Sequence, residues 1–506
     1  MKLRRLWWAF DKKNSNPQTQ AKLRPNRPTS RYLALQVSSN LLRQVFGMRN
    51  TLSSFVFRLS SFVLALFSAI SIQGCGRIWG GITWFNNPNT VIPEITQWLF
   101  VDGNGVSGLT NSGQQAYFPT LIVFNNKLYA SWTEYNPTTF QGNIYVRAYN
   151  GNDQSPSWTP VEGNGVNNGL NANNAHDASL PSLSVFNSKL YALWLEDSGT
   201  GVYQVRVKVY NGNDSAPNWA FVDGGSINVN PLINTNGFNA TGPRLIVVGG
   251  TLYGMWLEND NSNGKFLVRA RSYNGIDGAP VWTTIDGGSG LNWNSAASSP
   301  DYLSVISFNS NLYSTWREGD AGYNNRVTSY NGVSWNFVDG NVAATPMLEQ
   351  PGWTGATASG LGVFNHKLYF TACAASAGNL QVRASVYNGN DASPNWNFVD
   401  GGGTNGLNYN STYNGEYSYI GPANGRLYLN WAEDNGTGNL QIRFLSYNGN
   451  DNSPLWTFVD GNQVNGLNYN PNVPGANPSF VNFNSKVYAI WWEITGPDTV
   501  RVKVGY

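Results

Sequence analysis

The chain has 506 residues, of which 12% are charged and 14% aromatic, with a formal net charge of +2 and only two cysteines and two histidines. Two cysteines exclude a disulfide framework, and two histidines leave little material for a metal site or a His-based catalytic triad. We therefore expect no cofactor and no metal.

The first 74 residues differ in composition from the rest. Residues 1–47 contain ten Lys/Arg and one acid, Asp11, without a packing pattern, and are predicted to be a disordered or untranslated basic leader. Met48-Arg49 then precedes Arg58 and the apolar run Leu59 to Ile72, which is short for a spanning helix. Residues 48–74 are therefore predicted to be a signal peptide, with translation starting at Met48.

The segment Ile72-Gln73-Gly74-Cys75 resembles the lipobox of bacterial lipoproteins, in which the cysteine is acylated and becomes the mature N-terminus. It matches at Gly74 and Cys75 and departs at Gln73, where Ala or Ser is usual. The resemblance implies a palmitate-bearing protein anchored to the bacterial outer membrane or cell surface, with residues 75–97 as a tether. An ordinary signal peptide with an incidental cysteine is the alternative.

Removal of residues 1–74 changes the charge. Subtracting 12 of the 31 basic and 1 of the 29 acidic residues leaves 19 and 28, a net charge of −9 from Cys75 onward. A negative chain without basic clusters argues against nucleic acid as a partner. The expected partners are the membrane, through the lipid, and a glycan or surface protein.

A tryptophan opens a similar phrase seven times, with successive spacings of 60, 61, 63, 53, 61 and 60 residues, at Trp98, Trp158, Trp219, Trp282, Trp335, Trp396 and Trp456. A period of this length indicates a repeated supersecondary unit. Each unit contains four short runs rich in β-branched and aromatic residues, bounded by Gly, Asn, Asp and Pro. The fold class is therefore all-β, with each repeat an antiparallel four-stranded sheet.

Seven such sheets are predicted to form a seven-bladed β-propeller over residues 98–506, because a closed ring leaves few exposed sheet edges. An open solenoid is the weaker alternative. The first repeat begins with an orphan fourth strand at Trp98 to Asp102, and the last lacks a fourth strand after Val500 to Val504. We therefore expect the N-terminal strand to complete the last blade.

A Glu at the end of the second strand recurs with an Arg in the third strand. On one face of a hairpin the two could form a structural ion pair. The pairs are Glu134/Arg147, Glu196/Arg206, Glu258/Arg269, Glu318/Arg326, Glu433/Arg443 and Glu493/Arg501. The fifth repeat keeps Arg383 but has Ala372 and Ala374 at the Trp and Glu positions, so that blade has either lost a site or freed Arg383 for one.

An aspartate in the third connection precedes the strand-opening Trp by five residues, at Asp153, Asp214, Asp277, Asp391 and Asp451. This spacing resembles the Asp-box of sialidase-type propellers, although Ser-Pro or Ala-Pro replaces Gly-x-Thr and the fourth repeat shortens the turn. The resemblance implies a turn-stabilising aspartate that accepts backbone N–H bonds. Calcium binding is disfavoured because the turn lacks alternating carboxylates.

The connection between repeats carries the motif Gly-Leu-Asn-x-Asn and varies most, as binding loops do. Aromatic rings flanked by amides suit sugars, which stack on the ring and hydrogen-bond through hydroxyls. With Arg383, the candidate sugar contacts are Trp293, Tyr409, Tyr469, Asn292, Asn294, Asn408, Asn410, Asn468 and Asn470. The structural alternative is that these rings fill gaps between blades.

Over residues 98–506 the repeats resemble sialidase-like and Kelch-like propellers and propeller lectins. Sialidases of this fold carry an Arg-Ile-Pro stretch, which is absent here, and the histidines are His176 in a loop and His366 in a turn. No catalytic residue is identified, and we expect a lectin-like, lipid-anchored carbohydrate-binding protein. A protein-docking platform is the alternative, and a sialidase-like glycoside hydrolase is the second alternative. Cys373 is expected to be a buried thiol.

Overall fold

A computed structural model describes residues 94–506, except for 104–107, 112, 164–168, 226–232, 236, 260–263, 294–298, 320–323, 341–347, 349–353, 377, 403–404 and 462–464, and without the side chains of 354–358 and 376. The predicted leader, signal peptide and Cys75, together with Asn294 and most of the tether, lie outside the described residues. Among the described residues, no helix has the length and hydropathy needed to cross a membrane.

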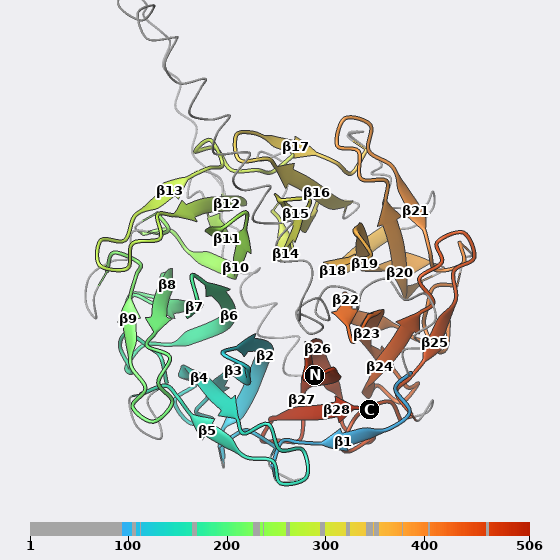
Figure 1. The fold of residues 1–506 in the computed structure, drawn as a ribbon, viewed down its shortest axis with the longest axis horizontal. Helices are drawn as coiled ribbons and strands as arrows, with labels where there is room; N and C mark the ends of the chain where they lie inside the picture. Colours follow the sequence, from blue (N-terminus) through green and yellow to red (C-terminus); the bar gives the residue numbers. More distant parts are fainter. Residues whose placement is uncertain are drawn as a thin grey trace, which may run out of the picture. The chain divides into compact units, whose positions relative to one another are not determined.

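Within the described residues, twenty-eight strands form seven four-stranded antiparallel sheets around an axis, as predicted (Figure 1). We number these sheets blades 1 to 7. Blades 1 to 4 are formed by β2 (Gln115–Phe124), β3 (Lys127–Tyr135), β4 (Gly142–Tyr149) and β5 (Trp158–Pro160); β6 (Ala178–Phe186), β7 (Lys189–Asp197), β8 (Tyr203–Tyr210) and β9 (Trp219–Phe221); β10 (Ala240–Val248), β11 (Thr251–Asn259), β12 (Phe266–Tyr273) and β13 (Trp282–Thr284); and β14 (Asp301–Phe308), β15 (Asn311–Glu318), β16 (Asn324–Tyr330) and β17 (Trp335–Phe337).

Blades 5 to 7 follow the same plan. They are formed by β18 (Thr354–Phe364), β19 (Lys367–Ser376), β20 (Asn379–Tyr387) and β21 (Trp396–Phe398); β22 (Gly415–Ala423), β23 (Arg426–Asp434), β24 (Leu440–Tyr447) and β25 (Trp456–Phe458); and β26 (Gly475–Phe483), β27 (Lys486–Glu493), β28 (Thr499–Gly505) and β1 (Trp98–Phe100). The first strand of each blade lies nearest the axis and the short fourth strand lies at the rim (Figure 1).

The ring closes through β1, which pairs with β28 in antiparallel register, Trp98 opposite Gly505 and Phe100 opposite Lys503. The two ends of the described chain therefore form one sheet, coloured blue and red in Figure 1. Thr96 N donates to Tyr506 O, and Tyr506 N donates to Gln97 O, which extends the pairing. This confirms the predicted closure of the last blade by the N-terminal strand.

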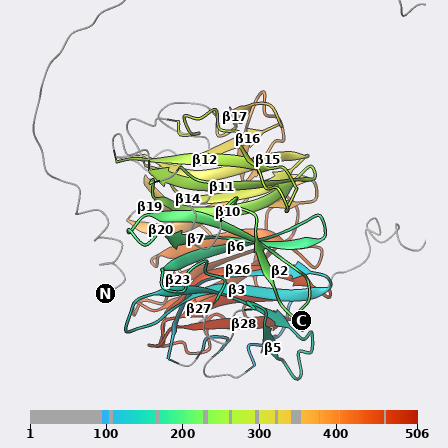
Figure 2. The same ribbon diagram turned by 90° about the vertical axis from the view of Figure 1, so that its left-hand side faces the viewer.

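Side chains between neighbouring blades form the core. The second strand of every blade except blade 5 carries a tryptophan that is at most 1% exposed, at Trp132, Trp194, Trp256, Trp316, Trp431 and Trp491. Burying 150–250 Å² of tryptophan surface stabilises the fold by about 4–6 kcal/mol per residue. Figure 2 shows the stacked blades from the side.

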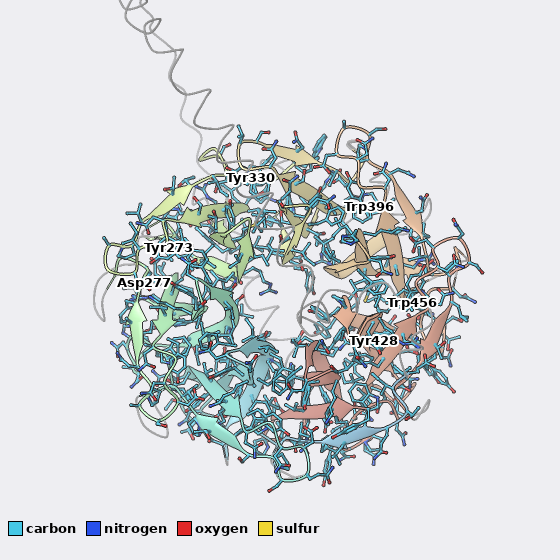
Figure 3. All side chains as sticks on the ribbon, viewed as in Figure 1. Tyr273, Asp277, Tyr330, Trp396, Tyr428 and Trp456 are labelled. Atoms are coloured by element: carbon cyan, nitrogen blue, oxygen red, sulfur yellow. The ribbon has the colours of Figure 1, made fainter. Side chains whose placement is uncertain are left out.

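The tryptophan that opens each fourth strand joins adjacent blades. Its indole N–H donates to a backbone carbonyl at the end of the preceding blade's fourth strand, over 2.6–2.8 Å. The seven bonds are Trp98 to Val459, Trp158 to Val101, Trp219 to Val161, Trp282 to Val222, Trp335 to Ile285, Trp396 to Val338 and Trp456 to Val399. Trp396 and Trp456 are labelled in Figure 3. The repeated tryptophan thus satisfies buried polar groups at every blade boundary.

The five turn aspartates bind across blade boundaries. Asp214 accepts hydrogen bonds from Tyr210 of its own blade and from Tyr129 and Lys127 of the preceding blade. Asp153, Asp277 and Asp451 have the same three kinds of partner, and Asp391 accepts from two tyrosines and Ser329. Tyr273 and Asp277 lie in one blade in Figure 3.

We expected these aspartates to accept hydrogen bonds from backbone N–H groups in the turn, but neighbouring asparagines accept them instead. Asn211, for example, accepts from Asn213 N and donates to Ala216 O. The prediction erred because an Asp and an Asn in one turn cannot be assigned roles from spacing alone. Blade 4 has no aspartate in this turn. At its boundary with blade 3, the ring centres of Tyr253 and Tyr330 lie 6.3 Å apart.

Candidate ligand-binding face

The strand order places two sets of connections on each face of the ring. Connections between second and third strands, and between fourth strands and the next blade, emerge on one face, which we call the loop face. The hairpins between first and second strands and the turns with the aspartates lie on the opposite, turn face. All candidate sugar contacts except Arg383 belong to the connections on the loop face.

The main ion-pair partner of the repeated arginines is an aspartate, not the expected glutamate. Each forms an ion pair with the aspartate that follows its own blade's fourth strand: Arg206 with Asp223, Arg269 with Asp286, Arg326 with Asp339, Arg383 with Asp400, Arg443 with Asp460 and Arg501 with Asp102. The strand register explains the error, since Arg206 lies opposite Trp194, whereas Glu196 lies opposite Gln204. For Arg501 the glutamate is a second partner, with Glu493 at 3.7 Å.

Blade 1 departs from this pattern. Tyr145, not Arg147, lies opposite Trp132, and Arg147 lies two residues further along, opposite Ala130. Glu162 replaces the aspartate, is 4% exposed, and accepts a hydrogen bond from Val146 N at 2.8 Å. Burial raises the pKa of Glu162 to about 7, against the lowering effect of backbone hydrogen bonds and of the Arg147 charge.

The repeated glutamates anchor the connections between blades. Glu433 accepts the indole N–H of Trp431 at 2.8 Å and the backbone N–H groups of Tyr409 and Asn410 at 2.9 and 2.8 Å. Glu134, Glu196, Glu258, Glu318 and Glu493 bind the tryptophan of their own blade and the equivalent loop backbone in the same way. Each glutamate therefore holds a segment of the loop face in place.

The side chain of the first asparagine in each Gly-Leu-Asn-x-Asn motif is hydrogen-bonded to backbone groups. Asn408 Oδ1 accepts from Val382 N at 2.7 Å, and its Nδ2 donates to Leu380 O and Tyr413 O. Asn468 has three equivalent bonds, and Asn292 bonds Val268 N and Phe266 O. These three amides are thus occupied by structural bonds rather than available to a sugar.

The second asparagine is more accessible. Asn410 Oδ1 accepts from the backbone and hydroxyl of Thr412, and Asn470 Oδ1 accepts from Asn472 N. These local bonds orient the two side chains. Both side chains are partly exposed, next to the aromatic residues that precede them.

The loop aromatics lie against the repeated arginines. The guanidinium carbon of Arg443 is 4.6 Å from the ring centre of Tyr409, that of Arg501 is 4.1 Å from Tyr469, and that of Arg326 is 4.9 Å from Trp293. The fourth-strand phenylalanines Phe458, Phe100 and Phe337 contact the same rings edge-on, at 5.6, 5.4 and 5.1 Å. Tyr409 and Tyr469 nevertheless remain 45% and 43% exposed.

The exposure of the rings bears on the alternative that they only fill gaps between blades. A ring that only filled a gap between blades would be buried, whereas Tyr409 and Tyr469 are supported on one side and open to solvent elsewhere. Trp293 is more covered, with a partly exposed ring. Blades 1, 2 and 3 carry Asn111, Ala172 and Thr235 at the same position, so the described aromatics at this position belong to blades 4, 6 and 7.

Arg383 is not freed for a ligand. It is 3% exposed, its Nε lies 2.6 Å from Asp400 Oδ2, and its guanidinium carbon lies 4.9 Å from the ring centre of Phe398. The loss of Trp and Glu in blade 5 leaves the Arg–Asp pair intact because neither residue forms that pair. Cys373 is a buried thiol, as expected.

A set of residues that the sequence reasoning missed lies at the inner edge of the ring. Arg317 forms an ion pair with Asp301 across the first two strands of blade 4, with Nε 2.6 Å from Oδ1. The guanidinium carbon of Arg317 also lies 4.8 Å from the ring centre of Tyr302. The sequence could have revealed this pair, because Arg317 occupies the variable position of the Trp-x-Glu motif, where blades 2 and 3 have Leu195 and Leu257.

The turn face carries a cavity of about 580 Å³ under blade 5, lined in part by Asn309, His366, Asn388 and Asn452. Its charged lining residues, Lys367 and Asp451, bind each other across a blade boundary. Among the described residues, no group of three or more His, Cys, Asp or Glu could hold a metal ion.

No protein-family model and no curated protein matches the chain. Among solved structures, an ulvan lyase is similar over 80% of this chain and 95% of its own, with 11% identity and a TM-score of 0.49. The Penicillium chrysogenum α-L-arabinanase is similar over 81% of this chain and 98% of its own (11%, 0.38), and the Trypanosoma rangeli sialidase over 66% of this chain and 55% of its own (12%, 0.42). At these identities the similarity concerns the fold alone.

Proposed function

We propose that the loop face binds carbohydrate through Tyr409 and Tyr469, with Trp293 as a further, more covered contact. The observation that carries the proposal is that two equivalent tyrosine rings, each backed by a buried arginine, are 45% and 43% exposed. A pyranose presents an apolar face of C–H groups, which packs on an aromatic ring, and hydroxyls, which need polar partners. Asn410 and Asn470 are the adjacent polar groups that we assign to the hydroxyls.

The support beneath the rings favours binding because it restricts their motion before a ligand arrives. Glu433 fixes the backbone of Tyr409 and Asn410, while Arg443 and Phe458 contact the Tyr409 ring. A side chain that is already ordered loses little conformational entropy on binding. Several weak sites presented on one face then bind a multivalent glycan surface through effective concentration.

We further propose that the chain acts at a bacterial surface, anchored by a lipid on Cys75. The apolar run before Cys75 and the lipobox resemblance support this proposal. One saturated chain gives only reversible membrane binding, so stable anchoring needs more than one acyl chain. The ring would then meet glycans outside the cell.

The test is a glycan array probed with the full chain in detergent. We expect binding to a subset of glycans, a partial loss for Tyr409→Ala or Tyr469→Ala, and a much larger loss for the double variant. Phe140→Ala is the matched control, since Phe140 is 71% exposed in a loop-face connection. An array without binding would contradict the proposal, and binding to a purified protein that ignores both tyrosines would favour the docking platform.

A further inference from the structure

Connections between blades have a second side-chain position on the loop face, a few residues after the position of Tyr409. In blade 6 it holds Tyr413, whose backbone N–H donates to Asn410 O at 2.9 Å and whose carbonyl accepts from Asn408 Nδ2 at 2.8 Å. We call the position of Tyr409 the first loop position and that of Tyr413 the second loop position. The equivalent pair of bonds defines the second loop position in three other blades, at His176, Phe238 and Val473.

Aromatic rings are distributed unevenly over these two positions. Blades 2 and 3 have a ring only at the second loop position, blade 7 has one only at the first, and blade 1 has none. In blades 1, 2, 3 and 7 the two positions hold, respectively, Asn111 and Gln114, Ala172 and His176, Thr235 and Phe238, and Tyr469 and Val473. Among the blades in which both positions are described, blade 6 therefore alone has two rings. Because other blades form the same connection with valine or glutamine, Tyr413 is not needed to build it.

Tyr413 is supported by a different part of blade 6 from Tyr409. Its ring packs on Gly436, in the connection between β23 and β24, where an added Cβ would lie 2.7 Å from Tyr413 Cζ. This connection is itself fixed, because Asp434 Oδ1 accepts hydrogen bonds from Gly436 N at 2.7 Å and from Gly438 N at 3.2 Å. A second, partly exposed ring is therefore held on the loop face before a ligand arrives.

The two rings of blade 6 are separate platforms. Tyr409 lies against Arg443 and Phe458, of the third and fourth strands, whereas Tyr413 lies against the connection between the second and third strands. A pyranose packs one apolar face on one aromatic ring. Two rings with separate supports on one face therefore suit two units of a sugar chain better than a single unit.

Polar groups suited to hydroxyls accompany the two rings. Thr412 donates from its backbone N–H and its hydroxyl to Asn410 Oδ1, at 3.0 and 2.8 Å, which fixes the orientation of the amide. Neither Asn410 Nδ2 nor the hydroxyl of Tyr413 has a hydrogen-bond partner among the described residues. Both groups are therefore available to sugar hydroxyls, which donate as well as accept.

We infer that blade 6 binds two successive units of an oligosaccharide, one on Tyr409 and the next on Tyr413. The inference rests on the proposed glycan binding and adds to it the length of the ligand and the blade that binds it most tightly. Blade 7 offers Tyr469 without a second ring, so it binds one unit. A monosaccharide then binds blades 6 and 7 alike, whereas a disaccharide prefers blade 6.

The test is isothermal titration of the full chain with soluble monosaccharides and the matching disaccharides, in a detergent without a sugar headgroup. The pairs are D-glucose and cellobiose, D-mannose and mannobiose, and N-acetyl-D-glucosamine and N,N′-diacetylchitobiose. In a pair that binds, we expect the disaccharide to bind about tenfold more tightly, because it contacts one further ring. Tyr413→Val, which introduces the residue of blade 7, should reduce this preference to about twofold and leave the affinity for the monosaccharide unchanged.

Two glycine variants separate the support of the ring from backbone strain. Gly436 and Gly438 both have φ of 85°, so alanine strains the backbone at both positions. Among the described residues, however, nothing lies within 4 Å of a Cβ added to Gly438, whereas a Cβ on Gly436 displaces the Tyr413 ring. Gly436→Ala should therefore lower the preference for the disaccharide as Tyr413→Val does, and Gly438→Ala is the matched control that should retain it.

Equal affinities for a disaccharide and its monosaccharide, a preference that survives Tyr413→Val, or an equal loss in Gly438→Ala would overturn the inference. If Tyr413→Val does not fold, Tyr413→Gln gives the same test, since Gln114 occupies the second loop position of blade 1. Monosaccharide binding that is lost in the Tyr409→Ala/Tyr469→Ala double variant, together with no effect of Tyr413→Val, refutes this inference and leaves the proposed function standing. A chain that binds none of these sugars contradicts both.

Discussion

The closure of the ring by β1 can be tested by removing one side chain at the junction. Trp98 donates to Val459 O at 2.6 Å and lies 5.1 Å from the ring of Phe444, yet the junction has no covalent link between β28 and β1. Such a hydrogen bond contributes about 1 kcal/mol. Truncating a buried tryptophan to alanine costs about 3–5 kcal/mol. Because Trp98 is only partly buried, we expect Trp98→Ala to lower the free energy of unfolding by about 3 kcal/mol.

Thermal and urea unfolding measure this loss. With an unfolding entropy of about 2.1 cal/mol/K per residue over residues 94–506, a loss of 3 kcal/mol lowers Tm by about 3–4 °C. Trp456→Ala is the matched control, since Trp456 is also partly exposed and donates to Val399 O of the preceding blade at 2.7 Å, but belongs to a blade whose four strands are consecutive in the chain. If Trp98→Ala melts with the wild type while Trp456→Ala shows the expected loss, the N-terminal strand does not close the ring.

Three further predictions address charge and anchoring. Glu162→Gln should stabilise the protein by about 3 kcal/mol at pH 8.5 and hardly at pH 4.5. Burial raises the pKa of Glu162 in the folded state to about 7, above its ordinary value of 4.5, so the stability that neutral Glu162 contributes is lost as pH rises through 7. Equal melting curves at pH 8.5 would refute it. Asp214→Asn should cost about 2 kcal/mol in urea unfolding. This loss should shrink in acid, because Lys127 and two tyrosines together outweigh the effect of burial and lower the pKa of Asp214. The same change at Asp434, at the partly exposed end of β23, should cost little. Cys75→Ser should abolish incorporation of labelled fatty acid, and a wild-type chain that takes up no label would refute the lipid anchor.

The architecture could be predicted from sequence because its signals are local and repeated. The orphan strand at Trp98 and the missing strand after Val504 together predicted ring closure, which the pairing of β1 with β28 confirms. Partners across the sheet could not be predicted, because they depend on register and on the neighbouring blade. Arg206 therefore binds Asp223 rather than Glu196, and Asp214 binds Tyr129 of the preceding blade.

The candidate site was predicted in part. The motif correctly marked Tyr409 and Tyr469 as loop aromatics, but it could not show that Asn408 and Asn468 bind backbone groups instead of facing solvent. Repetition also directed attention away from Arg317, since a search for equivalent residues overlooks a position where one blade differs from the others.

The central claim is that exposed tyrosines on supported loops bind carbohydrate. Isothermal titration of the strongest glycan from the array, against wild type, the Tyr409→Ala/Tyr469→Ala double variant and Phe140→Ala, tests it most directly. The account predicts wild-type affinity for Phe140→Ala and a loss of at least tenfold, about 1.4 kcal/mol, for the double variant at unchanged Tm. Equal affinities for all three proteins would contradict it.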